Sequence, residues 1–323
     1  MSDQTDPPRV VVVGLGLLGR GIVARFLGHG FQVLAIDRSE ARHREARKQL
    51  AQMMGELVEL GGLDSSICAG WETRYSAATG FEGVAGCSFA VESVTEQVEE
   101  KEAVYDALES RLAPATVIAT NTSAIPISQL QQRRKFPARF IGMHWAEPAH
   151  ATRFMELIRG EKTSDETLHL AVALARRLGK EPSICEKDIP GFIVNRIGYA
   201  MYREALSILE SGAADAATID AAMRNTVGLW ASVCGPLRWI DLTGGPELYA
   251  RAMQHVLPDL NTSPKLPARL QQLAADGAQG ITNGRGFYSY TPEEAHCWEE
   301  LYRKHAWRVA KMQDEYFPLN PHD

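Results

Sequence analysis

The segment VVVGLGLLGRGIVARFLGHGFQVLAID, residues 11–37, carries the strongest structural signal in the sequence. A valine run leads into Gly14-Leu15-Gly16-Leu17-Leu18-Gly19, a helical pattern follows, and a second apolar run ends at Asp37. In this context Gly14 permits a tight turn, Gly16 lets a pyrophosphate approach the main chain, and Gly19 lets helix and strand pack closely. The phosphates would meet the free N–H groups of a helix N-terminus. A carboxylate at Asp37 accepts from ribose hydroxyls and repels a 2′-phosphate, so residues 14–19 and Asp37 predict an NAD site. Arg38 is the neighbouring feature that would suit NADP.

Composition limits the class of protein. The chain has 323 residues, a length that suits two domains. Its net charge of -6 gives no basic field for nucleic acid, and no apolar run is long enough to span a membrane. The first ten residues, MSDQTDPPRV, lack the pattern of a secretory signal. Five scattered cysteines without metal-ligand spacing indicate reduced thiols, so we expect a cytoplasmic protein without a metal site.

The chain changes character near residue 188. Before it, short β-branched runs such as RVVVVG, FQVLAID, TVIATNTS and RFIGMHW alternate with helical patterns. That alternation predicts a Rossmann-type, doubly wound parallel sheet, an α/β domain over residues 1–188. Pro190 and Gly191 interrupt the chain, and apolar residues then recur at helical spacing. We therefore expect an all-α domain over residues 189–323.

A candidate base and its partner lie in GMHWAEPAHATRFMEL, residues 142–157. His144 ends one predicted strand, and Glu156 lies on the next. A histidine can accept a hydroxyl proton while hydride leaves the same carbon. A buried carboxylate on the far ring nitrogen would fix the tautomer and stabilise the imidazolium. A histidine satisfied within the core and an ordinary acid at a strand end are the alternatives. Pro148 argues against a metal site at His144, Glu147 and His150.

Several motifs in order resemble the 3-hydroxyacyl-CoA dehydrogenase family over nearly the whole chain. They are GLGLLG (14–19), NTS (121–123), MHW with Glu147-Pro148, DIPGFIVNR (188–196), GPLRWIDLTG (235–244) and GRGFYSY (284–290). The resemblance implies an enzyme that transfers hydride between a 3-hydroxyacyl substrate and NAD, as in fatty acid metabolism. It also implies a homodimer formed through the C-terminal domain, where apolar residues lie on more than one helix face.

The resemblance also implies roles for individual residues. His144 would be the base and Glu156 its partner. Ser123 and Asn195 would hydrogen-bond the substrate oxygen or the histidine, and Glu96 and Lys101 would contact the nicotinamide half of NAD. From the residues alone, Ser123 could cap a turn, Asn195 could be a polar core residue, and Lys101 could lie on a solvated helix face.

Departures from the family pattern bear on the substrate. Glu147 stands where the family usually has Asn, and Thr282 where it usually has Lys. Counted without gaps, the family's CoA-contacting Ser and Lys fall on Met53 and Leu60. Since binding CoA phosphates usually recruits Lys or Arg, these replacements favour a smaller acid. An earlier cationic group on the same helix could substitute: Arg42, Arg44, Arg47 and Lys48.

Part of the family acts on acids that carry no CoA, among them a bacterial enzyme of vitamin B6 breakdown that oxidises a pyridine aldehyde. The chain resembles it locally in GMHW, His150, GEKT (160–163) and YTPEE (290–294). His150 and Arg153 could therefore meet a substrate carboxylate, or could be polar residues of a surface loop.

Two other classes of protein fit the sequence less well than a dehydrogenase of this family does. A non-catalytic NAD-binding protein of the crystallin kind has no reason to keep His144, Glu156, Ser123 and Asn195 together. The 6-phosphogluconate-type dehydrogenases use a catalytic Lys on the helix after the domain boundary, and GFIVNRIGYAMYREAL (191–206) has none.

Overall fold

The computed structural model describes residues 7–319 of the chain. They form two compact units. The first unit runs up to Asn195 and resumes at Ala306, and the helical unit is Arg196–His305. The boundary between the two units, after Asn195, lies a few residues beyond the domain boundary expected near residue 188. The return of the chain to the first unit at Ala306 has no counterpart in the sequence pattern.

The first unit is built on one eight-stranded sheet with the order β3-β2-β1-β4-β5-β6-β7-β8. The strands are β1 (Arg9–Val13), β2 (Gln32–Ile36), β3 (Tyr75–Ala78), β4 (Phe89–Glu92), β5 (Val117–Thr120), β6 (Phe140–His144), β7 (Phe154–Ile158) and β8 (Glu181–Cys185). All neighbours from β3 to β6 pair in parallel, whereas β7 is antiparallel to β6. The expected α/β class is therefore confirmed. The strand order turns back between β1 and β4, the position where sheets of this kind bind ligands at the carboxyl ends of their strands.

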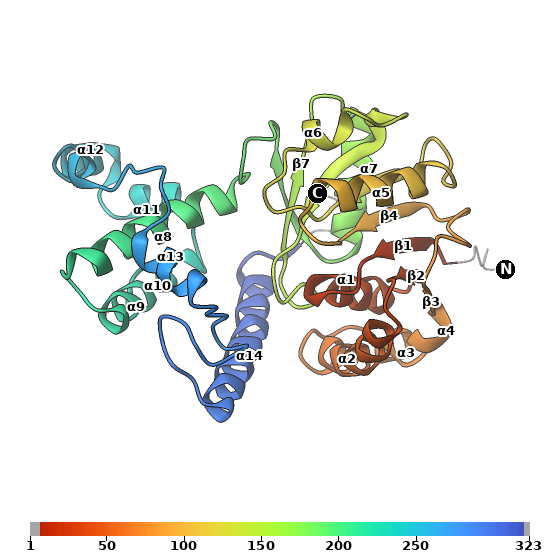
Figure 1. The fold of residues 1–323 in the computed structure, drawn as a ribbon, viewed down its shortest axis with the longest axis horizontal. Helices are drawn as coiled ribbons and strands as arrows, with labels where there is room; N and C mark the ends of the chain where they lie inside the picture. Colours follow the sequence, from red (N-terminus) through yellow and green to blue (C-terminus); the bar gives the residue numbers. More distant parts are fainter. Residues whose placement is uncertain (1–6, 320–323) are drawn as a thin grey trace. The chain divides into compact units, whose positions relative to one another are not determined.

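Helices cover both faces of this sheet (Figure 1). On β1, Val10 and Val12 belong to one apolar cluster, and Val11 and Val13 to another. The first cluster includes residues of α1 (Leu17–Gly28), α2 (Glu40–Glu59) and α7 (Asp165–Arg177), and the second includes residues of α5 (Val98–Glu109) and α6 (Ile127–Gln131). Because successive strand residues face opposite sides, one buried strand serves two cores. Two short helices, α3 (Ser65–Ala69) and α4 (Trp71–Arg74), precede β3.

The glycine turn after β1 is constrained by the next strands. Gly14 has φ 98°, and a Cβ there would collide with the backbone oxygen of Ser93, just beyond β4. A Cβ at Gly19 would collide with the backbone oxygen of Gly14. Only glycine therefore allows the turn to pass this close to β4 and α1 to pack this close to the turn.

The helical unit leaves nearly all of its apolar side chains accessible. Its helices are α8 (Val194–Ser211, which begins in the first unit), α9 (Ala216–Asn225), α10 (Val227–Ala231), α11 (Pro236–Leu242), α12 (Gly245–Val256), α13 (Ala268–Ala275) and the beginning of α14 (Pro292–Tyr316). Within Arg196–His305, Cys234 is the one residue that is buried. Leu229, Leu237 and Leu242 are 71%, 79% and 67% exposed. A stable soluble protein seldom leaves so much apolar surface uncovered.

The second half of α14 belongs to the first unit. Trp307 and Ala310 are buried there, and Trp307 joins the core cluster formed by α1, α2 and α7. Trp307 Nε1 donates a hydrogen bond to Glu56 on α2 at 3.2 Å. In the part of the chain that the structure describes, no helix is long and apolar enough to cross a membrane.

Candidate active site

His144 and Glu156 lie directly opposite each other where β6 pairs with β7. Nδ1 of His144 donates to Oε2 of Glu156 at 2.8 Å, and the two residues are 6% and 1% exposed. With its Nδ1–H bonded to a carboxylate, the neutral ring presents Nε2 as a proton acceptor. The edges of Phe154 and Phe192 lie against the imidazole, with ring centroids 5.7 and 6.0 Å away. The pair is thus a histidine held in one tautomer and one orientation.

The second oxygen of Glu156 supports the start of α8. Oε1 accepts hydrogen bonds from the backbone N–H groups of Ile193 and Val194, both at 3.0 Å. A carboxylate is favoured there because the first N–H groups of a helix have no partner within the helix. Glu156 therefore orients His144 with one oxygen and anchors α8 with the other.

Asn195, the next residue of α8, reaches the turn after β5. Its Nδ2 donates to the carbonyl oxygen of Ser123 at 2.9 Å, although 72 positions separate the two residues. The structure therefore brings Ser123 and Asn195 together through the backbone of Ser123, whereas the family resemblance implies that each bonds the substrate oxygen or the histidine. Through Glu156 they share one framework with His144.

The glycine turn and Asp37 lie at the carboxyl ends of β1 and β2. Asp37 is 9% exposed and accepts from the N–H groups of Leu15 and Ser39, each at 2.9 Å. Gly16 caps α1 without a side-chain hydrogen bond, the first turn of α1 has no acidic residue, and a Cβ at Gly16 would meet nothing within 4 Å. Helix N–H donors beside open space, with a fixed carboxylate nearby, fit the pyrophosphate and ribose of a dinucleotide.

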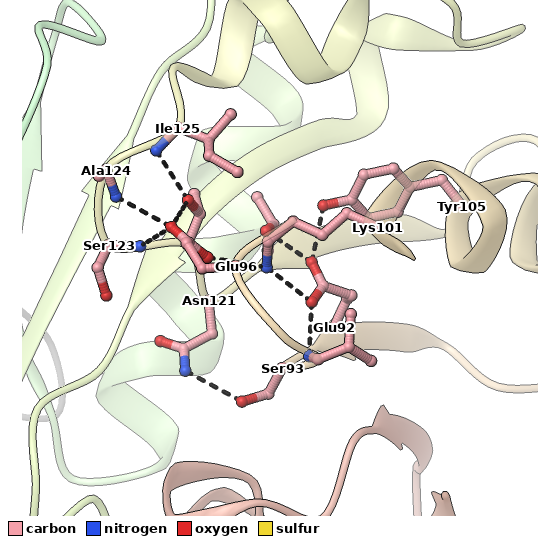
Figure 2. Close-up of polar contacts among 12 residues, drawn as sticks. Glu92, Ser93, Glu96, Lys101, Tyr105, Asn121, Ser123, Ala124 and Ile125 are labelled. Atoms are coloured by element: carbon pink, nitrogen blue, oxygen red, sulfur yellow. Dashed lines mark hydrogen bonds and ion pairs between the residues drawn. The ribbon is translucent and has the colours of Figure 1, made fainter. Parts of the chain in front are cut away.

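Glu96 and Lys101 are neighbours (Figure 2). They differ in accessibility to solvent. The side chain of Glu96 is 38% exposed, whereas that of Lys101 is fully buried. Lys101 Nζ lies 2.9 Å from Oε1 of Glu92 and 3.3 Å from Oε2 of Glu96. Lys101 shares a stripe of α5 with the buried Tyr105 and Leu108, a periodicity that is visible in the sequence. Glu92, at the end of a buried strand, was missed as a site residue because its partners come from three other segments.

His150 and Arg153 point to protein partners in the first unit. His150 Nε2 lies 3.0 Å from Oε2 of Glu56, and its ring contacts Trp307 edge-on. Arg153 bonds Glu181 at 2.9 Å and Asp314 at 3.3 Å. Both residues are at least 95% buried, with exposed fractions of 4% and 5%. These contacts differ from the expected encounter with a substrate carboxylate, because each side chain already has a carboxylate partner.

Three residues that depart from the family pattern have distinct surroundings. Burial raises the pKa of Glu147, an effect that an N–H of Ala149 and the charge of Arg20 oppose. Met53 is a residue of α2, and its partly buried side chain packs against the apolar core. Leu60, at the end of α2, is 44% exposed and apolar. Neither Met53 nor Leu60 can bind a phosphate.

Models of two protein domains match the chain. The NAD-binding domain of 3-hydroxyacyl-CoA dehydrogenase matches residues 9–189, and the C-terminal domain of that enzyme matches residues 191–290. Among curated proteins, the 5-formyl-3-hydroxy-2-methylpyridine 4-carboxylate 5-dehydrogenase of Mesorhizobium japonicum is 32% identical over 88% of this chain and 91% of its own length.

Solved structures give the same relationship. A 5-formyl-3-hydroxy-2-methylpyridine 4-carboxylic acid 5-dehydrogenase, described as an NAD⁺-dependent dismutase, superposes with a TM-score of 0.87 at 30% identity, over 96% of this chain and 99% of that one. The (S)-3-hydroxybutyryl-CoA dehydrogenase of Ralstonia eutropha gives 0.71 at 32% identity, over 88% of this chain and 100% of that one.

Proposed function

The chain belongs to the 3-hydroxyacyl-CoA dehydrogenase family, and on that premise we propose that His144 and Glu156 are the catalytic dyad of an NAD-dependent dehydrogenase acting on a small carboxylic acid without CoA. The observation that carries the dyad is the 2.8 Å hydrogen bond between Nδ1 of His144 and a buried Glu156. A non-catalytic NAD-binding protein would gain nothing from this arrangement beside Ser123 and Asn195.

In the oxidising direction, Nε2 of His144 takes the proton of the substrate hydroxyl. The glycine turn of residues 14–19 and Asp37 would hold NAD, which would supply the acceptor for the hydride that leaves the carbon bearing this hydroxyl. Glu156 holds the Nδ1–H and stabilises the imidazolium that forms, and it need not become protonated itself. The turn that carries Ser123 supplies a hydroxyl for the substrate oxygen, the role that family membership supports. In the reverse direction the imidazolium returns the proton.

The absence of CoA from the substrate is supported by α2. Met53 and Leu60 stand where the family's CoA-contacting residues fall, and both are apolar. The higher TM-score with the pyridine-carboxylate enzyme, 0.87 against 0.71, points the same way. We therefore place the substrate among hydroxy or aldehyde carboxylic acids, with a pyridine carboxylate as one representative.

A 3-hydroxyacyl-CoA substrate is the second candidate. It is favoured by the equal identity to the hydroxybutyryl-CoA enzyme, 32%. It is also favoured by exposed cations on α2: the side chains of Arg42 and Arg44 are 58% and 74% exposed, although each lies within 4.0 Å of a carboxylate. These side chains could bind the phosphates of CoA.

A substrate panel followed by NADH absorbance tests the proposal. It contains acetoacetyl-CoA, free 3-hydroxy acids, and aromatic hydroxy or aldehyde acids. We expect turnover of free acids, and a high KM for acetoacetyl-CoA that changes little with salt. A low-micromolar KM for acetoacetyl-CoA that rises steeply with ionic strength would overturn the small-acid assignment, because phosphate ion pairs are screened by salt. Absence of turnover across the panel would favour the non-catalytic alternative.

We also propose a homodimer formed through the helical unit. An apolar cavity of about 600 Å³ in that unit is lined by residues that include Leu206, Leu209, Leu270, Leu273 and Phe287. Together with the scarcity of buried residues in Arg196–His305, it supports a second copy as the cover for this surface. The five cysteines are free, which supports a reducing, cytoplasmic location.

A further inference from the structure

A buried polar network joins three elements of the first unit (Figure 2). At its centre is Glu92, the last residue of β4, which has no exposed surface. Its Oε1 accepts from the N–H of Val94 at 2.7 Å and from Lys101 Nζ at 2.9 Å. Its Oε2 accepts from Tyr105 at 2.7 Å and Thr120 at 2.8 Å. A buried carboxylate with four donors is satisfied and therefore rigid.

Lys101 transmits this rigidity to Glu96. Its ammonium group touches two carboxylates, that of Glu92 at 2.9 Å and that of Glu96 at 3.3 Å. The Lys101 side chain is fully buried, so it has no surface to offer to a dinucleotide. One cation between two acids leaves the cluster with one net negative charge, and removing the cation would leave two carboxylates to repel each other.

Glu96 in turn holds the backbone around Ser123. Its Oε1 accepts from the hydroxyl of Thr122 at 2.5 Å, from the N–H of Ser123 at 2.8 Å and from the N–H of Ala124 at 3.1 Å. Burial opposes ionisation of Glu96, yet the bond from Thr122, the charge of Lys101 and these N–H groups keep its pKa below the usual value. The ionised form is therefore the form that clamps the turn.

Ser123 is thus held from two sides. Glu96 takes its N–H at 2.8 Å, and Asn195 donates to its carbonyl oxygen at 2.9 Å. The side chain that remains for the substrate is the hydroxyl. The direction in which this hydroxyl points is set by a backbone fixed at both peptide groups.

We propose that Glu96 and Lys101 are positioning residues for Ser123. The buried Glu92–Lys101 pair fixes the carboxylate of Glu96, and Glu96 fixes the turn Thr122–Ala124. The inference rests on the proposed function, because it concerns the turn that presents Ser123 to the substrate. It replaces, for Lys101, the direct contact with the nicotinamide half of NAD that the family resemblance implies.

A double-mutant cycle tests the proposal. Glu96→Ala, Ser123→Ala and the double variant are compared for kcat on the best panel substrate and for NADH Kd by fluorescence titration. If Glu96 acts through Ser123, Glu96→Ala lowers kcat about 10- to 100-fold, and this loss nearly disappears in the Ser123→Ala background. NADH Kd should change less than about threefold. Lys101→Met should behave in the same way. Additive losses of kcat, or a rise in NADH Kd that matches the loss of kcat, would overturn the proposal.

A second measurement does not depend on turnover. Hydrogen–deuterium exchange of the peptide that contains Thr122–Ala124 should speed up in Glu96→Ala and stay unchanged in Glu99→Ala, the same change at an exposed acid on α5. Restored protection in Glu96→Gln, which keeps an oxygen acceptor, would add support. Unchanged exchange in Glu96→Ala would refute the clamp. If wild-type protein turns over no panel compound, the proposed function fails, and this exchange result still decides whether Glu96 holds the turn.

Discussion

Glu156 faces His144 across the antiparallel pairing of β6 and β7, and its carboxylate is shared between the imidazole at 2.8 Å and two N–H groups at the start of α8 at 3.0 Å. β7 is the strand at which the sheet changes direction. Because β7 runs antiparallel to β6, Glu156 comes soon after the start of β7 and yet lies opposite His144, the last residue of β6. A parallel β7 would begin, and not end, at the opposite edge of the sheet.

We expect His144→Gln to lower kcat by about 10² to 10⁴, the usual cost of losing a general base, with NADH binding nearly unchanged. Glu156→Gln should be severe as well, since an amide cannot stabilise the imidazolium. It also puts an NH₂ group toward either the ring or the N–H donors of Ile193 and Val194. Steady-state kinetics and NADH titration measure both variants, with Glu161→Gln, an exposed acid beyond β7, as the control. Near-native kcat in the His144 variant would exclude this mechanism.

Asp37 should make the protein discriminate against NADP. A 2′-phosphate beside this carboxylate meets like charge, and each 1.4 kcal/mol of repulsion is worth about tenfold in Kd. Asp37→Asn keeps an acceptor for the N–H of Leu15 or Ser39 while removing the charge, so the preference should narrow without loss of the fold. Titration calorimetry with both dinucleotides gives the ratio. Equal affinities in the wild-type protein would contradict the prediction.

The pair of Glu56 and His150 predicts an acid-dependent part of the stability. Burial opposes ionisation of Glu56, but hydrogen bonds from His150, Gln52 and Trp307 lower its pKa from 4.5 to about 2. A depressed pKa stabilises the fold above the unfolded value, and the contribution fades as pH falls from 4.5 toward 2. We expect Glu56→Gln to lower the free energy of unfolding at pH 6 by on the order of 2 kcal/mol.

Urea unfolding at pH 6, 4 and 3 measures this difference. The gap between wild type and Glu56→Gln should shrink toward pH 3, whereas Glu59→Gln, an exposed neighbour on α2, should show no such trend. A gap that is constant with pH would mean that the charge of Glu56 does not contribute.

The helical unit should be the dimer interface. Leu273 of α13 lines the apolar cavity, so Leu273→Asp should weaken association by burying a charge against apolar surface. Light scattering at micromolar concentration should show a dimer for the wild type and a shift to monomer for this variant. Ala275→Asp places the same charge on an exposed position of α13 and should leave the dimer intact. A monomeric wild type would count against the interface.

The sheet and the dinucleotide turn could be predicted because their signals are local. Glycine spacing, β-branched runs and Asp37 at a strand end all lie within residues 11–37. His144 and Glu156 could be proposed because neighbouring strands bring them together. The proximity of Ser123 and Asn195 could be expected only from the family motifs, since no local rule joins positions 72 apart.

The surroundings of His150 and Arg153 could not be predicted from their own segment. Their partners, Glu56 and Asp314, lie 94 and 161 positions away, and in the sequence both side chains look available to a ligand. Lys101 is different, because its spacing from Tyr105 and Leu108 marks it as a buried residue. The three acids around it, Glu99, Glu100 and Glu102, nevertheless make the same segment resemble a solvated helix face.

The return of the chain at Ala306 has a consequence for synthesis on the ribosome. Trp307 bonds Glu56, and Asp314 bonds Arg153. Both Trp307 and Asp314 emerge only after the whole of Arg196–His305 has been translated. Until then the nascent nucleotide-binding unit lacks the Trp307 ring in its core beside α2, and Arg153 has Glu181 but not Asp314 as a carboxylate partner. The first unit can therefore be completed only after the helical unit has been synthesised.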